Sequence, residues 1–155
     1  MIKWREALAI DHGPIDRDHK QLIAIVNEFY VAAEQGAGRP VLVAALRRLT
    51  RYTREHFARE EALQARIGYG DRAAHAKEHG RILDRLQGIV VAMENQPLEA
   101  TRQQTMDLVR HWIVDHVIGH DLHLRPAIDA YKNRLVPAGP EAAALEEDDE
   151  EYWSI

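Results

Sequence analysis

The chain has 155 residues, a size typical of one domain, and its 46% hydrophobic and 29% charged residues are an ordinary globular balance. It contains no cysteine, which excludes disulfide scaffolds, thiolate zinc fingers, cysteine-ligated iron–sulfur clusters and cysteine nucleophiles. No window approaches about 18 uninterrupted apolar residues, and the first six residues lack the plan of a secretory signal. We therefore expect a cytoplasmic protein without a membrane span.

The net charge of −5 is concentrated at the C-terminus. Residues 137–155 carry seven acidic residues and neither lysine nor arginine. A block of like charge is typical of a solvated tail, and this one is a candidate contact for a protein partner. We expect one domain over residues 1–136 and an acidic tail over residues 137–155. Elsewhere the basic residues alternate with acids, so we expect no binding to nucleic acid.

Four segments show the three- and four-residue apolar spacing of amphipathic helices. They run from about Asp16 to Gln35, from Pro40 to about Arg66, from the N-cap candidate Asp71 to about Glu94, and from Leu98 to about Arg125, where Pro126 is expected to end or kink the last one. No segment alternates with a period of two, so strands are not expected. Long helices joined by short breaks predict an all-α, up-down-up-down antiparallel four-helix bundle with a short N-terminal arm.

Histidines and carboxylates recur on the inner faces of these helices, and the chain has nine histidines in all. His56 and Glu60 are four residues apart, as are His75 and His79, so each pair shares a helix face. The other candidates are His19 in the first helix and His116 and Asp121 in the fourth. One such pair is common on a solvated helix face. The whole set would be costly to bury without metal, because each group would need its own partner.

The donor set indicates the kind of metal. Five imidazoles and two carboxylates exceed the needs of one tetrahedral zinc ion, and the lack of thiolates disfavours copper(I). Mixed nitrogen and oxygen donors suit iron or manganese, and their number predicts two metal ions. If both carboxylates and a solvent oxygen bridge the pair, three histidines complete six-coordination at one metal. Two histidines then leave one position open at the other metal.

Five motifs in this order resemble the hemerythrin family, specifically the bacterial single-domain hemerythrins, over about residues 4 to 125. The motifs are Trp4, Ile15-Asp16-Arg17-Asp18-His19-Lys20, His56-Phe57-Ala58-Arg59-Glu60-Glu61, Ile67-Gly68-Tyr69 followed by His75-x3-His79, and Trp112-Ile113-Val114-Asp115-His116-Val117-x3-Asp121. The resemblance implies two non-haem iron ions, Fe2+ or Fe3+, with a bridging oxo or hydroxo group and dioxygen as a reversible ligand.

The resemblance also implies a role for individual residues. Those that match the family's iron ligands are His75, His79 and His116 on one iron, His19 and His56 on the other, and Glu60 and Asp121 as bridges. Trp112, Ile113 and Val117 match the apolar lining of the family's ligand pocket. Ordinary core packing would bury these three side chains equally well.

One spacing conflicts with regular helical geometry. His116 and Asp121 are five residues apart, or about 140° around a helix, so they do not share a face. Periodicity alone favours His120 as the second ligand, whereas the resemblance favours Asp121. We follow the resemblance and expect either a π-type widening near residues 118–119 or an aspartate that reaches sideways.

The expected function is reversible dioxygen binding by a monomeric, non-enzymatic oxygen carrier, store or sensor. Carboxylate-rich di-iron oxidases pair glutamates with Glu-x-x-His motifs, whereas here five histidines accompany two carboxylates, which favours binding over turnover. Two alternatives remain at this stage. One is a di-iron enzyme that reduces peroxide, oxygen or nitric oxide, and the other is a regulatory module that acts through the acidic tail.

Overall fold

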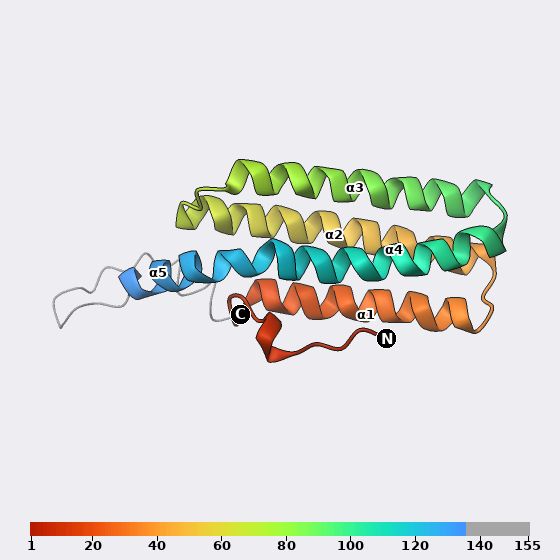
Figure 1. The fold of residues 1–155 in the computed structure, drawn as a ribbon, viewed down its shortest axis with the longest axis horizontal. Helices are drawn as coiled ribbons and strands as arrows, with labels where there is room; N and C mark the ends of the chain where they lie inside the picture. The colour runs from red at the N-terminus through yellow and green to blue at the C-terminus, as the bar shows by residue number, and fades with distance from the viewer. Residues whose placement is uncertain (136–155) are drawn as a thin grey trace.

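The computed structural model describes residues 1–135, apart from the side chains of Arg110, His111 and Ile113, so the expected acidic tail lies outside the described residues. The main elements are α1 (Pro14–Glu34), α2 (Arg39–Ile67), α3 (Arg72–Asn95) and α4 (Leu98–Gly119). These helices run alternately in opposite directions, and α1 and α3 each pack against both α2 and α4 (Figure 1). The predicted antiparallel bundle is confirmed, and the described part of the chain contains no strand.

Local sequence explains where the helices begin and end. Pro14 and Pro40 lie in the first turns of α1 and α2, where proline costs no hydrogen bond and its fixed φ suits the helix. Gly68 ends α2 at φ 69° and ψ 40°, the left-handed conformation that glycine adopts without a Cβ clash. The next residue, Tyr69, donates its backbone N–H to the Gln64 carbonyl at 2.9 Å and so closes the helix end.

Two apolar clusters hold the bundle together. The larger one extends between the four helices and includes Leu22, Phe29, Leu46, Leu86 and Val109, each at most 2% exposed. The smaller one contains Ile10, Ile15, Leu63, Ile67, Leu124 and Ile128. None of the described helices combines the length and apolar character needed to cross a lipid bilayer.

The fourth helix departs from the prediction, because it does not continue to Arg125. It ends at Gly119, His120 leaves the helical region at φ −125°, and η2 (Asp121–Leu124) forms a 3-10 turn. A further helix, α5 (Arg125–Leu135), follows and extends beyond the end of the bundle (Figure 1). Pro126 therefore begins a helix instead of ending one, because a proline in the first turn needs no intrahelical N–H bond.

An N-terminal arm that includes η1 (Glu6–Leu8) runs along α1 (Figure 1). Asn27 holds its beginning, since the Asn27 Nδ2 donates to the Ile2 carbonyl and the Ile2 N–H donates to the Asn27 Oδ1, both at 2.8 Å. Helix α5 holds its end: Arg125 donates to the Ala7 carbonyl at 3.0 Å, and Lys132 donates to the Asp11 carbonyl at 2.6 Å. The arm thus connects α1 to α5.

Candidate metal centre

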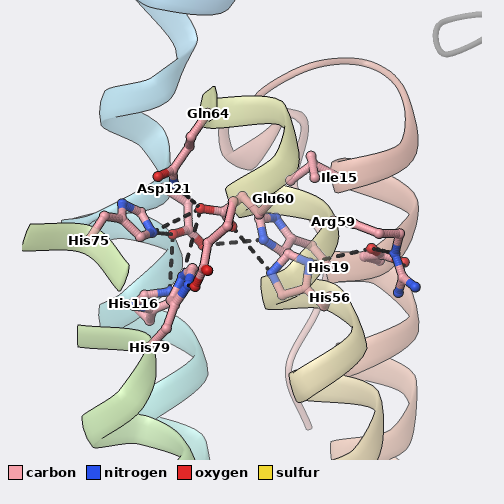
Figure 2. A network of polar contacts seen from close by, with 12 residues as sticks. Ile15, His19, His56, Arg59, Glu60, Gln64, His75, His79, His116 and Asp121 are labelled. Carbon is pink, nitrogen blue, oxygen red and sulfur yellow. Dashed lines mark hydrogen bonds and ion pairs between the residues drawn. The ribbon is translucent and has the colours of Figure 1, made fainter. Parts of the chain in front are cut away.

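The seven predicted ligand residues meet at one end of the bundle, where α1 and α3 begin and α2 and α4 end (Figure 2). They form two groups, and within each group one candidate ligand atom per residue lies within 4.8 Å of the others. The first group is His75, His79, His116 and Asp121, and the second is His19, His56, Glu60 and Asp121. All seven side chains are buried, the most exposed at 5%.

Asp121 lies between the two groups. Its Oδ1 is 3.1 Å from the Nε2 of His116 and 3.2 Å from the Nε2 of His75, both in the first group. Its Oδ2 is 3.2 Å from the Nε2 of His19, in the second group. The two oxygens of one carboxylate therefore face histidines of different groups.

Glu60 is arranged in the same way. Its Oε1 lies 2.8 Å from the Nε2 of His75 and 3.8 Å from the Nε2 of His79. Its Oε2 lies 3.4 Å from the Nε2 of His56. Each carboxylate thus offers one oxygen to the three-histidine group and the other to the two-histidine group.

The unpartnered polar atoms at this site match what metal ions require. The Nε2 atoms of all five histidines, both oxygens of Asp121 and the Oε2 of Glu60 are buried and make no hydrogen bond of good geometry, although several of them lie within 4 Å of one another. Each buried polar atom left unsatisfied costs about 1–3 kcal/mol. Metal cations would accept all of these lone pairs, and imidazole with carboxylate is a donor set that suits iron. The residues present therefore fit a two-metal centre.

The protonation states of two histidines favour ligation. Burial and the neighbouring His116 and His75 lower the pKa of His79 to about 2. Burial likewise lowers the pKa of His116 to about 4, despite the opposing charge of Asp121. Both imidazoles are neutral at pH 7. The pKa of His75 is raised to about 9, because Asp121 and Glu60 outweigh the effect of burial, so metal binding must displace a proton there.

The break at the end of α4 explains the five-residue spacing. Of the two expected arrangements, the π-type widening at residues 118–119 is wrong, because the helix ends at Gly119 and the chain turns through His120 into η2. Glycine is a poor helix former, which favours an end at this position. The change of backbone direction exposes His120 and leaves Asp121 fully buried, at 0% exposure.

Three more polar side chains contact the candidate ligands from outside the cluster. The Glu61 Oε1 lies 2.8 Å from the Nδ1 of His79, and the Gln64 Nε2 donates to the Glu60 Oε1 at 2.8 Å. The Asp18 Oδ2 lies 3.4 Å from the Nδ1 of His56. Sequence reasoning did not predict these three contacts. The four-residue spacing of Glu60 and Gln64 was a signal for the contact between those two residues.

Asp18 is itself held by two residues of α2. The Arg59 Nε donates to its Oδ2 at 2.7 Å, and the Tyr52 hydroxyl donates to its Oδ1 at 2.8 Å. Burial opposes ionisation of Asp18, but contacts with His56, Arg59 and Tyr52 keep its pKa well below the usual range. An ionised carboxylate behind a histidine fixes the ring orientation and makes the ring a stronger metal donor.

We expect the substitution Asp18→Asn to weaken metal binding about 10- to 100-fold, the usual cost of removing such a carboxylate. Asparagine keeps the shape of the side chain but not the charge that faces His56. Anaerobic titration of the metal-free protein with Fe(II) against a competing chelator measures the effect. Asp84→Asn, on an exposed position of α3, is the matched control. Equal Fe(II) affinity in both variants would contradict the role of Asp18.

An apolar cavity of about 30 Å³ borders the two-histidine group at His19. Its other lining residues are Ile2, Trp4 and Leu8 from the arm, Ile23 from α1, and Val114, Val117 and Ile118 from α4. Of the three predicted pocket residues, Val117 lines this cavity, whereas Trp112 packs in the larger apolar cluster. The side chain of Ile113 lies outside the described part of the chain.

Comparisons with known proteins agree with this geometry. The family model of the hemerythrin HHE cation binding domain matches residues 13–128. A bacteriohemerythrin of Methylococcus capsulatus is 32% identical over 84% of this chain and 98% of its own length. One of Stenotrophomonas maltophilia is 25% identical over 87% of this chain and 86% of its own. A wild-type hemerythrin crystal structure superposes with a TM-score of 0.70 at 26% identity, covering 83% of this chain and 98% of that one. The chain therefore belongs to the hemerythrin family.

Proposed function

We propose that the protein binds dioxygen reversibly at a non-haem di-iron centre, the type of centre that its family membership implies. The residues that would hold the iron ions are His75, His79 and His116 at one position, His19 and His56 at the other, and Glu60 and Asp121 between the two. One observation carries this proposal: each carboxylate directs its two oxygens to different histidine groups. Two carboxylates placed in this way suit two metal ions better than one.

The unequal number of histidines indicates where an external ligand binds. The His19 and His56 side offers one imidazole fewer than the other side, and the apolar cavity borders that side at His19. When bound, the iron pair supplies the electrons that dioxygen takes up on binding and returns on release. The protein's part is to leave a small apolar molecule a path to the His19 side.

The cavity walls also keep water from the site. Val117 and Ile23 are buried and apolar, and Trp4 and Leu8 cover the cavity from the arm. Water needs two to four polar partners to occupy a cavity, and the lining side chains are apolar apart from His19 and the indole N–H of Trp4, which already donates to a carboxylate of the arm. Dioxygen has no such requirement, so the walls select for it.

The lining also supports binding without turnover. Reductive cleavage of an oxygen–oxygen bond needs proton donors close to the bound ligand. Among the residues that the structure places around the cavity, none is acidic and none carries a hydroxyl group. We therefore propose a carrier, store or sensor of oxygen and not an oxidase or peroxidase.

The test is a cycle of oxygenation. Metal-free protein loaded anaerobically with Fe(II) should take up two irons per chain and develop a visible ligand-to-iron charge-transfer band in air. The band should fade under argon and return in air over repeated cycles. Continuous oxygen consumption in the presence of a reductant, without a persistent band, would identify an enzyme instead.

A further inference from the structure

Gln64 is a buried polar residue beside the candidate ligands. It lies one helical turn after Glu60 on α2 and is 0% exposed. Its Nε2 donates to the Glu60 Oε1 at 2.8 Å (Figure 2). Its own Oε1 is buried without a hydrogen-bond partner. The amide is therefore only half satisfied, and its one hydrogen bond goes to a candidate bridging carboxylate.

Packing alone does not explain this amide. Leu63 and Ile67, its neighbours in the sequence, belong to the smaller apolar cluster at the same end of the bundle. A leucine or methionine fills nearly the same volume as glutamine and removes the unsatisfied Oε1, but it also removes the donor to the Glu60 Oε1. What glutamine offers here beyond apolar packing is therefore a hydrogen-bond donor to the Glu60 carboxylate.

The hydrogen bond acts on one side of Glu60 only. Oε1 accepts from Gln64 and faces His75 and His79, whereas Oε2 faces His56 and has no hydrogen-bond partner. A donor on a carboxylate oxygen draws electron density from it and makes it a weaker metal donor. The donor also restrains rotation of the carboxylate, which keeps the two oxygens directed at different groups.

We propose that Gln64 is a positioning residue that holds Glu60 between the two metal positions and, by drawing charge from Oε1, favours the ferrous form of the centre. Weakening an anionic donor destabilises Fe(III) more than Fe(II), because the ion of higher charge gains more from electron donation. The ferrous form is the one that binds dioxygen, so Gln64 protects the protein from oxidation to an inactive ferric form. This inference rests on the proposed di-iron function.

The test compares two variants that lack the donor, Gln64→Leu and Gln64→Met, with the wild-type protein. Thr50→Val is the matched control, because Thr50 is a buried polar residue of the same helix whose hydroxyl bonds to the Leu46 carbonyl and not to the site. The measurements are iron per chain, the denaturant midpoint of the metal-free protein, the reduction potential of the loaded protein and its rate of oxidation in air.

In both Gln64 variants we expect a metal-free protein that stays folded, because the side chain keeps nearly the same volume. We also expect a lower reduction potential and oxidation in air about fivefold faster, the effect of one lost hydrogen bond. Iron below two per chain in a folded variant would equally support the positioning role. Full iron content with an unchanged or raised potential would overturn the inference. If the wild-type protein itself fails to bind two irons, the proposed function fails instead.

Discussion

Replacing Glu60 by glutamine is expected to lower the iron content from two ions per chain to below one. The substitution keeps the shape of the side chain and removes one of the two charges that lie between the histidine groups. The metal-free variant should stay folded, because burial and the charge of Asp121 already raise the pKa of Glu60 and make its ionised form costly. Metal analysis after anaerobic loading, with circular dichroism of the metal-free form, measures both effects.

The lower iron content of Glu60→Gln should also reduce the stability that the protein gains from iron binding. A ligand present at about 100 times its dissociation constant stabilises the folded state by about 2.7 kcal/mol for each site. The wild-type protein should gain this stability on loading, whereas Glu60→Gln should gain little. Glu55→Ala, on an exposed position of the same helix, is the control and should load normally. Two irons per chain in both Glu60→Gln and Asp121→Asn would contradict the bridging assignment.

Replacing Ile128 by aspartate is expected to reduce the free energy of unfolding by about 4 kcal/mol, since it removes a buried aliphatic side chain and buries an unpaired charge. Ile128 is 0% exposed and is the buried residue of α5 in the smaller apolar cluster, together with Ile10, Ile15 and Leu63. Because α5 follows η2 directly, loss of its docking should also release Asp121 and weaken iron binding.

Guanidinium unfolding of the metal-free protein, together with iron content after loading, measures both consequences. Ala130→Asp places the same charge on an exposed position of α5 and should leave both quantities unchanged. An Ile128→Asp protein with the wild-type denaturant midpoint would show that α5 does not support the bundle. If the variant loses the expected stability but binds iron as the wild type does, then docking of α5 does not hold Asp121 in place.

The family motifs anticipated the candidate site more completely than helical periodicity did. Periodicity indicated the pairs His56 with Glu60 and His75 with His79, because residues four apart share a face whatever the fold. It favoured His120 over Asp121, since it assumes that the helix continues. The structure ends the helix at Gly119, so the position after His120 turns inward. A candidate ligand that follows a break in a helix, as Asp121 does, is identified from sequence through resemblance to known relatives and not through periodicity.

The sequence by itself determined the four helices of the bundle, their order and their buried faces, because apolar spacing, prolines and glycines act within a few residues of themselves. It did not indicate α5 or the contact of Asp18 with His56. Only the tertiary structure decided which side chains of different helices meet, such as Asp18 of α1 with Arg59 of α2. The reason is physical: such contacts depend on how far each helix is rotated and shifted against its neighbours, and these quantities follow from packing of the whole core.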